Sequence, residues 1–224
     1  MRPSYLWLYA IPVAVSCSVS AAFADSGSVV SGICVHVYNY AGVPGSEMTR
    51  ARAEAARVLA QAGIETRWVE FMADRERGVR QVNPNGDCAS GGQQGPSHLT
   101  VSIYPRTMAQ TFRLSAADFG FALLPSEKGE FGNRANVFFE RVILLEEMSG
   151  ASRALILGHA MAHEVGHLLL GAGSHSPSGI MRAPWRRTEL QQAATGILHF
   201  TDGEARRMRQ QIHARLKGKT AEPF

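Results

Sequence analysis

The sequence lacks any strong excess of charge, because its 224 residues carry a formal net charge of only +4. A dedicated nucleic-acid-binding protein would carry a larger and more clustered positive charge, so we expect no nucleic-acid partner. Beyond the N-terminus there is no apolar run long enough for a membrane span, and we expect no transmembrane anchor. Internal repeats and low-complexity tracts are also missing. These absences favour a single globular domain with a sizeable core, which we expect to be a monomer.

The one membrane-like segment lies at the N-terminus and predicts export. Arg2 precedes an uncharged, mostly apolar stretch over 5–19, and Ala22-Phe23-Ala24 has the small-x-small form of a signal peptidase site. We therefore expect a signal peptide over 1–24 and a mature domain over 25–224. The mature protein would be secreted to the periplasm or the extracellular space.

Cysteine is scarce, with three residues in the whole chain. Cys17 lies in the expected signal peptide, where a lipid anchor is an alternative although the preceding residues match a lipidation signal poorly. Cys34 and Cys88 remain, and an even pair in an exported protein suggests one disulfide. That bond would stabilise the fold by roughly 4 kcal/mol by restricting the unfolded chain. The alternative is two free thiols.

Hydrophobic periodicity predicts an α/β (α+β) fold. Residues of alternating polarity indicate strands, and apolar residues three and four apart indicate helices. The polar, Gly-rich stretch 83–96 is typical of a surface loop. We expect a twisted mixed sheet of about five strands packed on two long helices, with a small C-terminal helical lobe. The expected strands are 33–40, 66–71, 99–103, 119–123 and 135–142, and the expected helices are 46–62, capped by Ser46, 152–171, and a last one capped at 201–202 and ending near 216.

The residues His163-Glu164-Val165-Gly166-His167 spell H-E-x-x-H within the apolar run 154–170. Residues four apart share one face of a helix, so His163 and His167 can direct two imidazole nitrogens at one Zn²⁺. Glu164 is rotated away from the two histidines and suits a metal-bound water better than the metal. The pattern predicts a zinc site in which Glu164 takes a proton from the attacking water and returns it to the leaving amine.

A catalytic zinc normally has three protein ligands and one open position, so a third donor is needed. His175 is favoured because the chain turns at Gly171-Ala172-Gly173 and can bring it back over the end of the helix. Glu189 is the main alternative, and the remaining candidates are His199 and Asp202. Met181 ends a tight turn just after His175, and we expect its side chain to support the metal site from below.

These residues resemble the signature of the metzincin clan of zinc peptidases, H-E-x-x-H-x-x-G-x-x-H followed by a Met-turn. The resemblance is closest to the matrixin branch, without its usual tyrosine after the methionine. Gly171 follows His167 by four residues instead of three, and His175 follows it by eight instead of six, so a wider loop is expected. The residues that carry the resemblance are His163, Glu164, His167, Gly171, His175 and Met181.

The resemblance implies a zincin-like fold with an upper lobe over 25–171, which includes the zinc helix, and a lower lobe over 172–224. It also implies that an edge strand near 119–124 pairs with extended substrate. A specificity pocket is expected between the helix and the segment 175–185, with Trp185 either lining it or packing in the lower lobe.

The other histidines and the basic C-terminus have plainer interpretations. His159 lies one turn before His163 and is expected either in the core or in contact with a residue that binds the metal. His36 and His98 are interpreted as ordinary strand or surface residues, as are His199 and His213. The six basic residues between 206 and 219 are expected on the solvated face of a terminal helix.

The favoured function is a secreted zinc endopeptidase acting on a protein or peptide substrate. Alternatives are a zinc amidase acting on a non-protein or cell-wall amide and a metal-bearing binding module that has lost activity. In the remaining alternative, the motif is accidental and no metal binds.

Overall fold

The structure is a computed structural model that describes residues 30–74, 78–82, 88, 97–109, 119–125 and 132–217. The expected signal peptide and most of the expected loop 83–96 lie outside these residues. Export and the lobe boundaries therefore stay predictions. Within the described chain, no helix combines the length and the apolar character that a membrane span requires.

One mixed sheet of six strands forms the centre of the fold, in the order β3-β2-β1-β4-β6-β5. The four central strands run parallel, while β3 and β5 lie antiparallel at the two edges. The predicted mixed α/β class is therefore confirmed, with one strand more than expected. The strands are β1 (Val30–Asn39), β2 (Ile64–Asp74), β3 (Gly78–Gln81), β4 (His98–Tyr104), β5 (Gly120–Leu123) and β6 (Arg134–Phe138).

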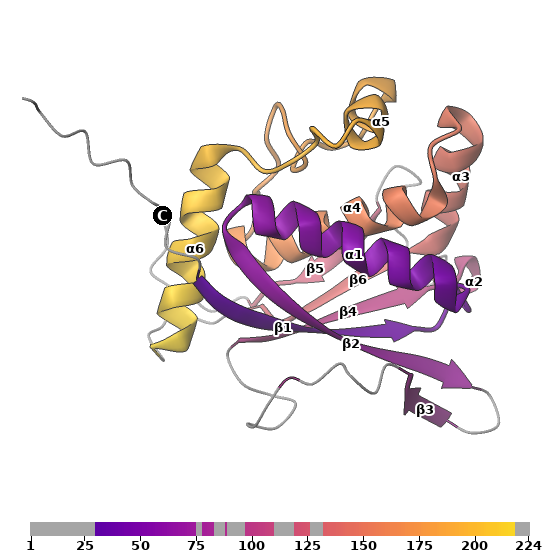
Figure 1. Cartoon of the computed structure of the whole chain (residues 1–224), viewed down its shortest axis with the longest axis horizontal. Helices are drawn as coiled ribbons and strands as arrows, with labels where there is room; N and C mark the ends of the chain where they lie inside the picture. The colour runs from indigo at the N-terminus through magenta and orange to yellow at the C-terminus, as the bar shows by residue number, and fades with distance from the viewer. Residues whose placement is uncertain are drawn as a thin grey trace, which may run out of the picture.

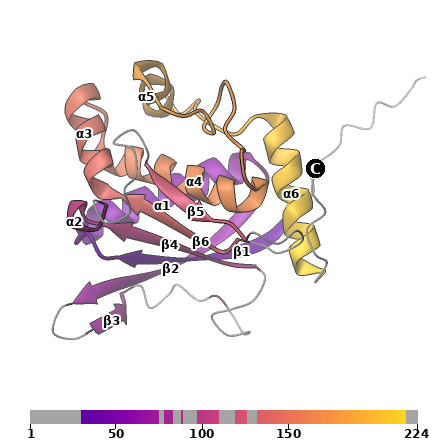
Figure 2. The ribbon, with the colours of Figure 1, turned by 180° about the vertical axis from the view of Figure 1, so that it is seen from behind.

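Two long helices cover one face of this sheet (Figure 1). The first connects β1 to β2 as the crossover between two parallel strands, and the second packs beside it and against β5 and β6. Figure 2 shows the same layering from behind, with the opposite face of the sheet turned away from both helices. The helices are α1 (Gly45–Gln61), α2 (Arg106–Ala109), α3 (Phe139–Ser149), α4 (Arg153–Leu170), α5 (Arg187–Ala194) and α6 (Asp202–Leu216).

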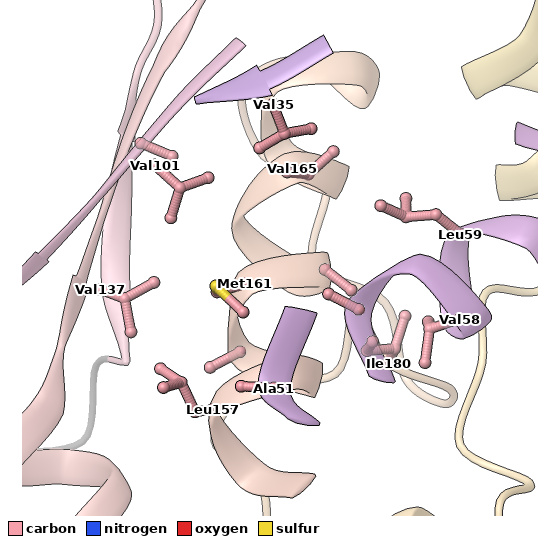
Figure 3. Close-up of a cluster of buried hydrophobic side chains, with 14 of the residues drawn as sticks. Val35, Ala51, Val58, Leu59, Val101, Val137, Leu157, Met161, Val165 and Ile180 are labelled. Atoms are coloured by element: carbon pink, nitrogen blue, oxygen red, sulfur yellow. The ribbon is translucent and has the colours of Figure 1, made fainter. Parts of the chain in front are cut away.

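The core lies between the sheet and the helix pair (Figure 3). Val101 and Val137 extend from the sheet toward Met161 of α4, and Leu59 comes from α1, all of them fully buried. The predicted alternation along β4 is confirmed, because every second residue of this strand is buried. This packing sets the position of α4 against the sheet and therefore the position of its side chains relative to β5.

Two predicted boundaries are wrong. The strand expected over 135–142 ends at Phe138, and the chain continues directly as α3. Val142 and Leu145 are both buried and lie three residues apart, which is a helical spacing that a short apolar run conceals. Ser46 does not cap α1, because Pro44 holds the cap position and its carbonyl accepts the Met48 N–H at 2.9 Å.

Three short elements were not expected from the sequence, namely β3, α2 and α5. All four residues of β3 are exposed, so no buried face marks it in the sequence. The last helix, in contrast, begins as predicted: the Thr201 hydroxyl accepts the Glu204 N–H, and the Glu204 carboxylate accepts the Thr201 N–H.

Arg215 corrects the expectation of a solvated basic face on α6. Its side chain is buried, and Nη2 donates to the carbonyls of Gly132 at 2.8 Å and Leu168 at 2.7 Å. Burial lowers the pKa of this guanidinium to about 10, which still leaves it charged at neutral pH. A buried charge is tolerated only with such hydrogen bonds, so Arg215 ties α6 to the end of α4 and to the start of β6.

Candidate metal centre

Helix α4 presents the two motif histidines as neighbours on one face. Nε2 of His163 and Nε2 of His167 lie 3.0 Å apart, a separation that the four-residue spacing on a helix allows. The helix ends at Leu170, and Gly171 follows it with a positive φ of 86° that suits glycine and with an N–H that still donates to the His167 carbonyl. The chain is therefore free to turn back about one helical turn after the second histidine.

The turn that follows α4 brings His175 to the same point. Nε2 of His175 lies 3.2 Å from Nε2 of His167. The Ser176 N–H donates to the Met181 carbonyl at 3.1 Å, and the Ile180 N–H donates to the His199 carbonyl at 3.0 Å. These two bonds close the loop, so a spacing of eight residues still returns the third imidazole to the helix.

The three histidines form a group in which the potential ligand atoms all lie within 4.8 Å of one another. Nitrogens bound to one tetrahedral zinc are about 3.3 Å apart, because each Zn–N bond is about 2.0–2.1 Å long. The separations of 3.0 Å and 3.2 Å between neighbouring Nε2 atoms are close to this value. The donor set and its spacing therefore fit a zinc ion.

Hydrogen bonds on the far nitrogens orient two of these rings. His163 Nδ1 donates to the Ile180 carbonyl at 2.7 Å, and His167 Nδ1 lies 2.8 Å from the Ser174 hydroxyl. A histidine that uses Nδ1 in this way keeps the lone pair of Nε2 for a metal. The sequence did not indicate Ser174 or the Ile180 carbonyl as hydrogen-bond partners of these histidines. Their positions depend on the path of the loop, which no local pattern in the sequence reveals.

Both helix histidines are neutral at physiological pH. Burial lowers the pKa of His163 to about 4, with a further contribution from His175 and a partial offset from its bond to Ile180. Burial, followed by the charges of His163 and His175, lowers the pKa of His167 to about 3. Neutral imidazoles are the form that binds metal ions.

Met181 packs against α4 at Gly166, which lies between the two motif histidines in the sequence. It is fully buried, and a Cβ atom placed on Gly166 would lie 2.6 Å from Met181 Sδ and 2.7 Å from Cε1 of Phe200. Glycine at position 166 has no Cβ atom and therefore allows Met181 and Phe200 to pack close to the helix. The turn around Met181 therefore packs against α4 between the positions of His163 and His167, and its support of a metal site stays a prediction.

Replacing Gly166 with alanine should destabilise the metal-free chain. The added methyl group has no space against Met181 and Phe200, and overpacking of this kind costs about 1–3 kcal/mol. The free energy of unfolding, measured in urea with a chelator present, checks this prediction. Gly203→Ala is the matched control, because its Cβ meets nothing within 4 Å, and it should change stability by less than about 1 kcal/mol. Equal stability of the two variants would contradict the packing argument.

Glu164 lies beside the histidines under the edge strand β5. Its side chain is 2% exposed, and Oε1 would be 3.1 Å from a Cβ atom placed on Gly120. The same Cβ would overlap the Asn136 carbonyl oxygen on the neighbouring strand. Gly120 thus lets β5 pass close over the carboxylate, a contact that no pattern in the sequence indicates.

A cleft of about 410 Å³ opens between β5 and the loop that follows α4. The three histidines and Glu164 line this cleft, and the other described lining residues are uncharged. This cleft is lined by α4 and by part of the segment 175–185, where the pocket was expected, and its role in specificity stays a prediction. The lining residues are Phe119, Gly120, Phe121, Ala122, Leu124, His163, Glu164, His167, Ala172, Gly173, His175, Ala183 and Pro184.

The alternative third donors lie elsewhere. Glu189 is buried in α5, where its carboxylate accepts from Arg182 Nη1 at 2.9 Å and from the Arg186 N–H at 2.7 Å. His199 is exposed, and Asp202 begins α6. Within the described chain, none of these three belongs to the group of metal-capable residues around α4.

Trp185 and His159 pack behind the histidines. The ring centroid of Trp185 lies 4.3 Å from Phe119 and 5.8 Å from His163, and its Nε1 donates to the Ile180 carbonyl. Trp185 therefore supports the site and does not appear among the cleft-lining residues. His159 is fully buried and directs Nδ1 at the Leu155 carbonyl, 3.0 Å away, so it is a core histidine.

Comparison with known proteins adds a structural likeness. No family model matches the chain, and no curated protein sequence matches it. A solved structure of a zinc-dependent peptidase from Methanocorpusculum labreanum is similar over 78% of this chain and 99% of that chain, with 14% sequence identity and a TM-score of 0.49.

Proposed function

We propose that this chain is an exported zinc-dependent endopeptidase, in which His163, His167 and His175 bind the metal and Glu164 acts as the general base and acid. The convergence of three imidazole Nε2 atoms beside a buried glutamate, on the wall of an open cleft, carries the proposal. A structural zinc would take four protein donors, whereas this group offers three histidines and an adjacent acid–base residue.

Zinc in this site would act as a Lewis acid and lower the pKa of a bound water toward roughly 7. Glu164 accepts the proton of the attacking water on its carboxylate and transfers it to the leaving amine. Its burial favours this role, because few solvent molecules compete for the carboxylate. His163 and His167 stay neutral and fixed by their Nδ1 contacts, so their Nε2 atoms need no rearrangement.

The edge strand β5 offers a way to hold an extended substrate. It pairs with β6 on one side and ends the sheet on the other within the described chain. A peptide laid along the free side would use backbone hydrogen bonds, with its side chains entering the cleft. The apolar lining residues Phe119, Phe121 and Leu124 favour an uncharged, apolar side chain next to the scissile bond.

Removal of the metal should abolish peptide cleavage. After treatment with a chelator, the chain should lose at least about a hundredfold in activity on a mixed peptide library, and zinc should restore it. Mass spectrometry of the products should show internal cuts beside apolar residues. Unfolded casein should be digested broadly, whereas cleavage of cell-wall amides alone would favour the amidase alternative. A purified chain that holds no zinc and cuts neither substrate would overturn the proposal.

A further inference from the structure

A second group of metal-capable side chains lies on the opposite face of the sheet. Cys34 and His36 alternate on β1 with the core residues Ile33, Val35 and Val37, so they point away from α1 and α4. His98 on β4 pairs directly with Cys34 in the parallel register. His36 and His98 do lie on strands, as expected, and the pairing of β1 with β4 also places both beside the cysteine, which no pattern in the sequence indicates.

Short contacts connect these three side chains. Nε2 of His36 lies 3.3 Å from Cys34 Sγ and 2.9 Å from Nδ1 of His98. His36 is 6% exposed, and its Nδ1 makes no hydrogen bond with the described residues. Two imidazole nitrogens this close must share either a proton or a cation. All three potential ligand atoms lie within 4.8 Å of one another.

The state of the disulfide decides whether His36 and His98 share a proton or a cation. Cys34 is bonded to Cys88, with a Cα–Cα distance of 5.9 Å, as the sequence predicted. While this bond is intact, neither sulfur is a thiolate, and His36 and His98 share a proton. A dithiol reductant can reduce the Cys34–Cys88 disulfide by donating two electrons and two protons, and the reductant is itself oxidised to a disulfide. Cys34 and Cys88 are then two free thiols beside the histidines.

We propose that the reduced chain binds Zn²⁺ through Cys34, Cys88, His36 and His98. Each thiol releases its proton as it binds the cation, so two thiolates and two neutral imidazoles give a complex without net charge, which suits a half-buried site. Sulfurs on one tetrahedral zinc lie about 3.8 Å apart, a separation that side-chain rotation reaches at this Cα distance. Four protein donors close the site, so its role is structural.

The site has a route for the ion. His36 and His98 line a hollow of about 650 Å³ on the open face of the sheet, together with Tyr38 and Thr100.

Metal binding at this site would give a cross-link between β1 and Cys88 that survives reduction of the disulfide. A disulfide makes this connection under oxidising conditions, and the metal makes it under reducing ones. The proposal does not depend on the peptidase function, since the two groups lie on opposite faces of the sheet.

Cobalt substitution tests the site directly. The full chain is stripped of metal, reduced with dithiothreitol, desalted without oxygen and titrated with Co²⁺. We expect one more Co²⁺ per chain than in the oxidised protein, together with the near-ultraviolet sulfur-to-cobalt charge-transfer band. The three-histidine group contains no thiolate and cannot produce that band, so failure of the first site leaves this readout unaffected.

Variants locate the donors. His98→Ala, at a half-buried position, should weaken Co²⁺ binding at least about tenfold and shift the band, whereas the exposed control His213→Ala should change neither. Cys88→Ser should bind the second Co²⁺ without any reductant, because Cys34 is then free. The proposal is overturned if the reduced chain gains no thiolate band, or if that band is unchanged in both His98→Ala and His36→Ala.

Discussion

Glu164→Gln should lower the rate of peptide hydrolysis by about a thousandfold, because general acid–base catalysis typically contributes 10²–10⁴-fold. Glutamine keeps the size of the side chain but cannot accept the proton of the attacking water. The three histidines are unchanged, so the zinc content should remain that of the wild type. Metal analysis and steady-state kinetics on one peptide measure both quantities in the same preparation.

Glu204→Gln is the matched control for this substitution. Glu204 is as buried as Glu164, but its carboxylate accepts the Thr201 N–H at the start of α6 and is absent from the cleft. This variant should lose some stability through the weakened cap and keep its turnover. Wild-type turnover in Glu164→Gln would remove Glu164 from the acid–base role, and loss of zinc there would mean that the carboxylate acts as a ligand.

His175→Ala should lower zinc affinity by more than about a hundredfold, since even indirect partners of ligands contribute 10–100-fold. The imidazole supplies one of three donors, and its Nε2 lies 3.2 Å from that of His167. The side chain is exposed, so the metal-free variant should unfold at nearly the wild-type urea concentration. Competition with a chromophoric chelator measures the affinity.

Glu189→Ala provides the opposite result for comparison. This substitution removes the partner of Arg182 and of the Arg186 N–H, so it should destabilise α5 and reduce stability. Zinc affinity should stay within a few-fold of the wild type, because Glu189 is not part of the histidine group. If His175→Ala kept full affinity while Glu189→Ala lost it, the third donor would be wrongly assigned.

Much of the fold could be predicted because its signals are local. The alternation over 33–40 and 99–103 and the apolar run 154–170 each indicate one element through its own periodicity. The stretch 135–142 shows the limit of that reasoning. An apolar run of this length fits a strand or a buried helix equally, and the protein uses its first half in β6 and its second in α3.

In the candidate site, too, some features follow from local sequence and others depend on the tertiary structure. His163, Glu164 and His167 are related by helical geometry alone, so their spacing in the sequence indicates their arrangement in space. The position of His175 depends on the loop that Met181 and His199 close, and the contact of Gly120 with Glu164 depends on the pairing of β5 with β6. No local pattern contains that information.

By itself, the sequence indicated the helix that carries two imidazoles and a carboxylate and the mixed α/β class, and it favoured a disulfide between Cys34 and Cys88. Each follows from periodicity, from spacing or from a count. Only the tertiary structure decided that His175 joins the helix pair, that Glu189 does not, and that His36 and His98 meet beside Cys34. The physical reason is that these contacts join residues brought together by strand register and loop closure, which arise from packing of the whole chain and not from neighbouring residues.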